Sequence, residues 1–277
     1  MLAFRLELLG RHRCTPQQLN PELTAESKRE MLFAMKRPPL PVAVPEEFRA
    51  TIIGTYEVVD GLVQVAGDVD LSCLELTELP IKFGTVSGYF YCADNRLKSL
   101  AGAPMTVGGD CYCNDNQLRS LAGSPKTVGG DFYCAYNELA SLEGGPRAVL
   151  GSFNCYHNQL RSLRGAPERV ANDFYCSNNR LQSLEGAPKV VGRTFYCSHN
   201  QLQSLVGAPE TVGGNFSCAR NQLQSLADAP TRVGRDFFCY GNSLQSLGGA
   251  PKSVGRAFKS DPDIPGLADY LRKIGSA

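Results

Sequence analysis

Long apolar runs and an excess of charge of one sign are both missing from this sequence. No apolar stretch approaches the roughly 18 to 20 residues that a helix needs to cross a bilayer. Residues 1–10 have only a short apolar core, interrupted by Glu7, which does not favour a secretory signal peptide. Lys and Arg number 28 against 27 Asp and Glu, so the net charge of +1 gives no argument for any class of partner. We expect a soluble, cytoplasmic protein with no membrane partner.

The motifs that usually mark catalytic and metal sites are missing as well. No Ser-His-Asp grouping and no pair of carboxylates stands out, and each Gly-Gly belongs to a repeated turn, not to a phosphate-binding loop. The 11 cysteines include no Cys-x2-Cys pair, the spacing typical of zinc ligands. The sequence therefore predicts no enzymatic activity, no cofactor and no bound metal.

What the sequence has in abundance is a repeat of 21 residues. Each unit reads approximately Gly-Asp-Phe-Tyr-Cys-x-x-Asn-Gln-Leu-x-Ser-Leu-x-Gly-Ala-Pro-x-x-Val-Gly, and eight units occupy residues 88–255. The columns that begin at Asn95, Leu97, Leu100 and Pro104 have no exception. A fixed period of this length predicts a solenoid, in which each unit buries its apolar side against its neighbours.

The segment Cys-x-x-Asn-x-Leu-x-x-Leu in each unit resembles the core of the leucine-rich repeat, with Cys and Phe in place of two leucines. The units look similar to the short repeats of bacterial effectors and of uncharacterised phage and bacterial proteins. The resemblance implies a horseshoe that binds partners through its concave strand face. Some such effectors carry a ubiquitin-ligase domain with a catalytic Cys after the repeats. The 22 residues after Gly255 contain no Cys, so that activity is not carried over.

The columns predict which side chains face the core. Phe90, Tyr91 and Cys92 alternate in, out and in, as a short parallel strand requires. The Phe, Cys, Leu and Val columns point inward, and the Asn column bonds the backbone of the adjacent turn. Gly-Ala-Pro cannot continue a helix, so the convex side is expected to be extended or turn-like. The predicted fold is a repeat solenoid, mostly parallel β, with a small helical N-terminal cap and a short C-terminal helix.

The ends of the chain depart from the repeat. Residues 1–66 are expected to form a cap, with a helix over 15–37, a proline-rich connector and a hairpin around Asp60-Gly61. Residues 67–87 match the repeat as a degenerate first unit. Residues 256–277 are expected to form a C-terminal cap with a short helix over 264–274. Helical pieces at both ends fit the need to cover a solenoid, although 1–66 could instead offer a second binding surface.

The eight periodic cysteines, from Cys92 to Cys239, are predicted to be a buried apolar ladder. Neighbouring side chains would lie about 4.8 Å apart and point the same way, which does not suit a disulfide between adjacent turns. Disulfides and a metal site are the less favoured alternatives. A reduced ladder would be typical of the cytosol.

The outward positions of the strands and the positions just after them form the candidate binding surface. Tyr rings there can bury area and form hydrogen bonds with a partner, or they can simply stabilise the sheet by stacking. The column after the strands grades from Asp94 to Arg220, which favours a partner of opposite polarity. The candidate partner-binding residues are Tyr91, Tyr112, Tyr133, Tyr136, Tyr156, His157, Tyr175, Tyr196, His199, Arg220, Phe238 and Tyr240.

The sequence therefore predicts a non-catalytic scaffold that binds a macromolecule, most simply a protein. By analogy with phage and effector repeats, its target would be a host or defence component. The alternative is a glycan or a single-stranded nucleic acid stacked on the same rings. Asp110, Asp131 and Asp173 border the strand face, which makes a nucleic acid the less favoured ligand.

Overall fold

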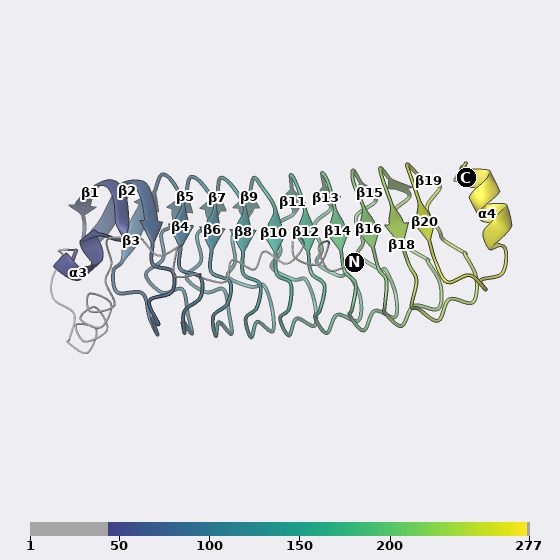
Figure 1. Cartoon of the computed structure of the whole chain (residues 1–277), viewed down its shortest axis with the longest axis horizontal. Helices are drawn as coiled ribbons and strands as arrows, with labels where there is room; N and C mark the ends of the chain where they lie inside the picture. Colours follow the sequence, from purple (N-terminus) through teal and green to yellow (C-terminus); the bar gives the residue numbers. More distant parts are fainter. Residues whose placement is uncertain (1–43, 276–277) are drawn as a thin grey trace.

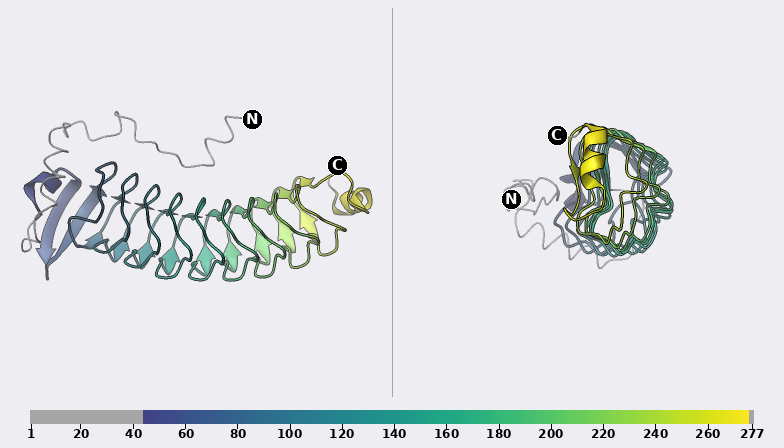
Figure 2. Two further views of the ribbon diagram at one scale, coloured as in Figure 1. Left: turned by 90° about the horizontal axis from the view of Figure 1, so that it is seen from below. Right: turned by 90° about the vertical axis from the view of Figure 1, so that its right-hand side faces the viewer.

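The computed structural model describes residues 44–275 of the 277-residue chain. These residues form one elongated stack of turns, and Figure 1 shows two columns of short strands running along it. Seen end-on, successive turns lie one behind another (Figure 2). The chain is a leucine-rich-repeat-like solenoid of parallel strands, as the sequence predicts.

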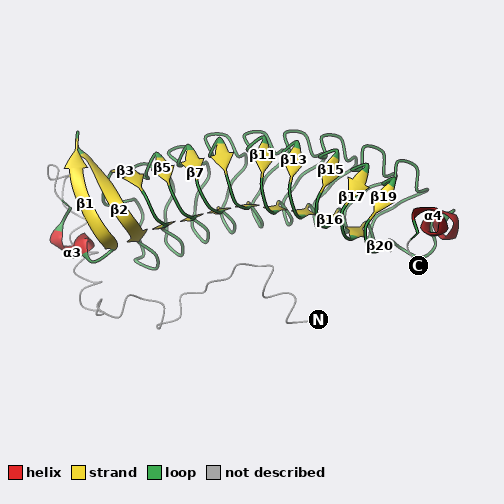
Figure 3. Cartoon of the chain, turned by 90° about the horizontal axis from the view of Figure 1, so that it is seen from above, coloured by secondary structure: helices red, strands yellow, loops and turns green. Residues whose placement is uncertain are grey.

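One column of strands holds the Phe and Tyr positions of the units. Each strand pairs in parallel with its neighbours, so that Phe153 lies beside Phe132 and Phe174. The stack curves gently in Figure 3, and these strands follow its inner side, so we call them the inner ladder. The inner ladder consists of β4 (Phe90–Tyr91), β6 (Cys111–Tyr112), β8 (Phe132–Tyr133), β10 (Phe153–Asn154), β12 (Phe174–Tyr175), β14 (Phe195–Tyr196), β16 (Phe216–Ser217), β18 (Phe237–Phe238) and β20 (Phe258–Lys259).

A second column of strands follows the outer side of the arc, and we call it the outer ladder (Figure 3). Here Val170 pairs in parallel with Val149 and Val191. The expected extended convex side is therefore a second parallel ladder, because β-branched Thr-Val pairs favour strands and their backbone groups need partners. The outer ladder consists of β3 (Phe83–Val86), β5 (Thr106–Val107), β7 (Thr127–Val128), β9 (Ala148–Val149), β11 (Arg169–Val170), β13 (Val190–Val191), β15 (Thr211–Val212), β17 (Arg232–Val233) and β19 (Ser253–Val254).

A hairpin and a short helix, α3 (Glu46–Arg49), stand at the N-terminal end of the stack. Strands β1 (Ile52–Val59) and β2 (Leu62–Asp70) pair antiparallel around Asp60-Gly61, as the sequence predicts. β2 then pairs in parallel with both β3 and β4, and so joins the two ladders. The helix expected over 15–37 lies outside the described residues.

Helix α4 (Leu267–Ile274) stands at the other end, where a short helix was expected. Its Tyr270 ring packs edge-on against Phe258, with 4.7 Å between ring centroids. The Tyr270 hydroxyl donates a hydrogen bond to the Pro251 carbonyl at 2.8 Å. α4 therefore covers the apolar end of the last turn, which a solenoid otherwise exposes. Among residues 44–275, no helix has the length and apolar character needed to span a bilayer.

The core consists of columns of identical side chains, as predicted from the period. From Phe132 to Phe258, rings in successive turns lie 5.2 to 5.5 Å apart. The Cys column and both Leu columns are almost wholly buried over most of the stack. Nine cysteines are free and buried, and the thiol of Cys155 donates to the Tyr175 carbonyl at 3.3 Å. The cysteine ladder of the sequence analysis is thus a buried apolar column.

Candidate partner-binding face

Tyrosines line the inner ladder on the side that faces away from the core. The Tyr91 and Tyr112 rings stack nearly parallel, with centroids 4.9 Å apart, and Tyr112 lies 4.6 Å from Tyr133. Tyr175 and Tyr196 form a second pair at 5.7 Å. Each of these side chains is half-buried. The rings therefore stabilise the sheet by stacking and still present part of their surface outward.

Two polar residues interrupt the tyrosine column. Asn154 and Ser217 occupy outward strand positions, where the sequence placed them on the surface, yet they are only 3% and 7% exposed. The side-chain oxygen of Asn154 accepts the backbone N–H of Tyr156 at 2.9 Å. Ser217 shares a hydrogen bond with the Ser198 hydroxyl at 2.6 Å. These small polar side chains are thus covered by their neighbours, and they divide the column of exposed rings into separate groups.

A column rich in Asp runs beside the tyrosines, two positions earlier in each unit. The Oδ1 atom of Asp110 accepts the backbone N–H of Asp131 at 2.7 Å, and Asp131 does the same for Ser152 at 2.6 Å. These side chains satisfy strand-edge N–H groups, which accounts for their recurrence without any ligand. In four other turns the side chain of this column likewise accepts the backbone N–H of the residue at the same position one turn later. These acceptors are Asp68, Asp173, Asn215 and Asp236.

The carboxylates also fix the tyrosine hydroxyls. Tyr112 donates to Oδ2 of Asp110 and Tyr133 donates to Oδ2 of Asp131, each at 3.2 Å. Burial, and then the charge of Asp110, raises the pKa of Tyr91 to about 12. Burial and the neighbouring carboxylate likewise raise the pKa of Tyr112 and of Tyr133. These hydroxyls stay protonated, so they act as donors in fixed positions.

The graded polar column just after the strands has a local structural cause. Its residues have φ values between 52° and 55°, in the left-handed region, and Gly241 follows at 69°. Asp, Asn, His and Gly enter this region more readily than other residues, which explains much of the column's composition. The sequence reading missed this turn, although the recurrence of these types was its signal. The residues at 52° to 55° are Asp94, Asp115, Tyr136, His157, Asn178, His199 and Arg220.

The structure brings three of the predicted residues together beside the middle of the inner ladder. The Tyr136 ring stacks on His157 with centroids 4.9 Å apart, and it meets Tyr156 edge-on at 5.4 Å. The Asn178 amide donates to the Tyr156 hydroxyl. His199 lies exposed two turns beyond His157, and the part of the chain from 44 to 275 contains no cluster of three side chains suited to a metal ion.

The last turns carry a second aromatic group. Phe238 and Tyr240 meet edge-on at 6.5 Å, and the Lys259 ammonium lies 5.6 Å from the Phe238 ring centroid. Arg220 and Tyr240 are exposed beside them. The twelve predicted residues therefore divide into clusters along the inner ladder and do not form one continuous row of rings.

Sequence reasoning missed one aromatic member of the face. Tyr89 replaces Asp in the first full unit, stacks on Tyr91 at 5.6 Å and is 42% exposed. An aromatic residue in a column otherwise rich in Asp was the available signal. With Tyr89, the first turns carry four neighbouring rings.

No protein-family model matches the chain, and no curated protein matches it. Among solved structures it is similar to YopM from Yersinia enterocolitica WA-314, with 14% sequence identity, a TM-score of 0.34, and coverage of 72% of this chain and 72% of that one. The assignment of a leucine-rich-repeat-like solenoid rests on the repeated parallel turns of the chain itself.

Proposed function

We propose that this chain is a non-catalytic scaffold that binds a protein partner through the tyrosine-lined face of its inner ladder. The observation that carries the proposal is the set of outward rings held on a parallel sheet, from Tyr91 to Tyr133 and from Tyr175 to Tyr196. Rings that are already fixed by stacking and hydrogen bonds lose little conformational freedom when a partner covers them. Aromatic residues are also the type most often found at the energetic centre of protein interfaces.

The other predicted residues extend this face toward the ends of the strands, where the chain turns away. Aromatic, imidazole and guanidinium groups in that position would form the polar edge of an interface around the rings. This edge consists of Tyr136, Tyr156, His157, His199, Arg220 and Tyr240, whereas Phe238 lies in the column of rings itself.

The cellular setting belongs to the proposal too. The nine free, buried cysteines favour a reducing compartment such as the cytoplasm, whereas Cys73 is disulfide-bonded. The resemblance of the repeat units to those of phage proteins and bacterial effectors favours a host or defence component as the target.

The test compares two triple Ser variants, one that alters the inner ladder and one that alters the outer ladder. The inner variant replaces Tyr133, Tyr175 and Tyr196 by Ser, a residue that Ser217 already places in that column. The outer variant replaces Arg169, Val190 and Arg232 by Ser, which Ser253 already places in the outer column. The wild-type chain is used to capture its partner from the native lysate, and the isolated partner is then titrated by calorimetry with each variant.

We expect the inner variant to lose the partner and the outer variant to keep it. Truncation of a central aromatic residue typically weakens binding by about thirtyfold, so three losses would take a micromolar complex beyond detection. Circular dichroism spectra that match the wild type are required of both variants, so that a loss of binding is not a loss of fold. Unchanged affinity in the inner variant would contradict the proposal, and loss in the outer variant would place the site on the outer ladder. Capture of a glycan or single-stranded nucleic acid would favour the alternative ligand.

A further inference from the structure

Charge is unevenly distributed along the inner face. In the first four turns, the columns beside and within the row of rings contain six half-buried carboxylates and no Lys or Arg. In later turns these columns contain Arg220 and Lys259 beside Asp173 and Asp236. The column one residue before the Asp column, which is Gly in the first four turns, contains Arg193, Arg235 and Arg256. The six carboxylates are Asp68, Asp70, Asp94, Asp110, Asp115 and Asp131.

The carboxylates of the first turns surround aromatic rings. Burial and the charges of Asp110, Asp68 and Asp70 all act on the hydroxyl of Tyr91 and raise its pKa. Asp110 uses one oxygen for a backbone N–H and the other for the Tyr112 hydroxyl. Each carboxylate oxygen has a second lone pair, so Asp110 can accept a further donor from a ligand.

The chain itself places a cation on this row of rings at its far end. Lys259 occupies the tyrosine column in β20, and its ammonium lies 5.6 Å from the centroid of the Phe238 ring one turn earlier. That distance is within the range of a cation–π contact. The geometry of the inner ladder thus allows a positive side chain to rest over a ring of this column.

We propose that the inner face over β4, β6 and β8 docks a protein segment rich in Lys and Arg, whose cations lie over the tyrosine rings between the carboxylates. This inference rests on the proposed function and names the chemistry of its partner. From the turn of Asp68 to that of Asp131 is about 14 Å, or four to five residues of an extended chain. The basic later turns favour acidic groups in the part of the partner that lies there.

The probe is a fluorescein-labelled octapeptide of alternating arginine and glycine, titrated by fluorescence anisotropy against the full chain. The test variant, Asp110→Asn with Asp131→Asn, removes two charges. Asn215 shows that Asn preserves the scaffold bond, because its Oδ1 accepts the Asp236 N–H at 3.1 Å and its amide donates to the Tyr196 hydroxyl. The matched control, Asp173→Asn with Asp236→Asn, makes the same change in the later turns.

We expect the arginine peptide to bind, and a peptide of alternating glutamine and glycine to bind at least about tenfold more weakly. The test variant should weaken arginine-peptide binding about fivefold, while the control stays within about twofold of wild type. Raising the salt concentration from about 0.05 M to about 0.5 M should weaken the wild-type complex.

Equal binding of the two peptides, or wild-type affinity in the test variant, would overturn the inference. So would tighter binding of a labelled thymidine octanucleotide than of the arginine peptide. Failure of the proposed function gives a different result. If only the preference for cations is wrong, the triple Tyr variant still loses the captured partner, whereas if the face is wrong, that variant keeps it.

Discussion

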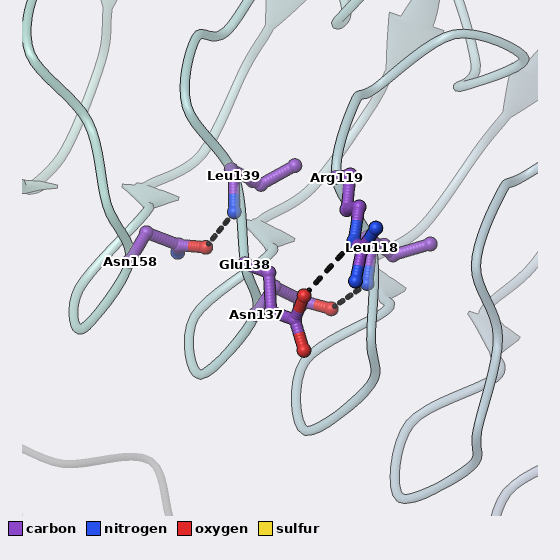
Figure 4. Close-up of polar contacts among 6 residues, drawn as sticks. All are labelled: Leu118, Arg119, Asn137, Glu138, Leu139 and Asn158. Carbon is purple, nitrogen blue, oxygen red and sulfur yellow. Dashed lines mark hydrogen bonds and ion pairs between the residues drawn. The ribbon is translucent and has the colours of Figure 1, made fainter.

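The side-chain oxygen of Asn137 accepts the backbone N–H of Leu118, which lies one turn earlier in the stack, at 2.9 Å (Figure 4). Its amide nitrogen donates to the carbonyls of Cys113 at 3.0 Å and Cys134 at 3.2 Å, so one side chain bonds to two turns. Asn158 repeats the arrangement with Leu139. The Asn column is therefore structural, as its unbroken recurrence predicts.

Replacing Asn137 by Ala should destabilise the chain by at least about 2 kcal/mol. The variant leaves the buried N–H of Leu118 without its acceptor, and an unsatisfied buried polar group costs about 1 to 3 kcal/mol. The buried carbonyls that the amide contacts add to this cost. Urea unfolding followed by circular dichroism measures the difference in the free energy of unfolding.

The control for this prediction is the adjacent residue. Glu138 makes an ion pair with Arg119 at 3.0 Å, also between two turns and drawn in Figure 4, but both side chains are substantially exposed. Exposed ion pairs contribute about 0.2 to 1 kcal/mol. Glu138→Ala should therefore change stability by less than about 1 kcal/mol. Equal losses in the free energy of unfolding of the two variants would show that the buried hydrogen bonds of Asn137 stabilise the stack no more than an exposed ion pair does.

Replacing Ser124 by Ala should stabilise the protein. Its hydroxyl is buried without a hydrogen-bond partner, and it stands in a column where most units have Ala. Removing an unsatisfied buried hydroxyl should raise the free energy of unfolding by about 1 kcal/mol. Ser120→Ala is the control, because the Ser120 hydroxyl accepts the Ala122 N–H at 3.3 Å and its loss should not stabilise. A lower urea midpoint for the Ser124 variant would contradict the prediction.

Periodicity predicted the parts of the fold that repetition itself determines. A residue type that recurs every 21 positions stacks on its own copies, so the inward Phe, Cys and Leu columns follow from the period alone. The hairpin at Asp60-Gly61 followed from local turn chemistry, since both residues adopt positive φ, at 51° and 76°. The recurrence is visible within a single column of the repeat, and the turn is visible in two adjacent residues.

The features that sequence reasoning missed depend on relations between columns. Whether Thr106 and Val107 form a strand depends on whether the next turn offers its backbone at the right distance. The burial of Asn154 depends on the taller residues that flank it, and the scaffold bond of Asp110 depends on a backbone N–H in the next turn. A single column of the repeat predicts whether a side chain points inward or outward. It does not predict how far neighbouring side chains cover it or which backbone group it contacts.

Thiol labelling provides a prediction about the cysteine ladder. Burial raises the pKa of the Cys155 thiol, as it does along the ladder, so little reactive thiolate is present. A thiol reagent at about pH 7.5 should therefore modify the native ladder slowly and the urea-unfolded chain rapidly. Mass spectrometry of labelled peptides gives the rate at each position. Rapid native labelling at Cys155 or Cys176, in the middle of the stack, would contradict the buried ladder.

Stability should fall steeply in mild alkali because of the same thiols. Burial raises the pKa of Cys92 to about 12, and it raises the pKa of the other ladder thiols too. A thiol in the unfolded chain, by contrast, ionises near pH 8.5. Above about pH 8.5 the unfolded chain therefore binds fewer protons than the folded chain. Each thiol then lowers the free energy of unfolding by about 1.4 kcal/mol per pH unit. Urea midpoints between about pH 7 and 9.5 should show the loss.

A double variant separates this effect from ordinary packing. Cys155→Ala with Cys176→Ala removes two of the nine buried free thiols, and the lost volume should lower stability at every pH. The slope of stability against pH above about 8.5 should nevertheless become shallower, because two fewer thiols ionise on unfolding. Tyrosines contribute to the slope only near pH 10 and above, since that is where they ionise in the unfolded chain. An unchanged slope in the double variant would mean that groups other than the buried thiols cause the alkaline loss.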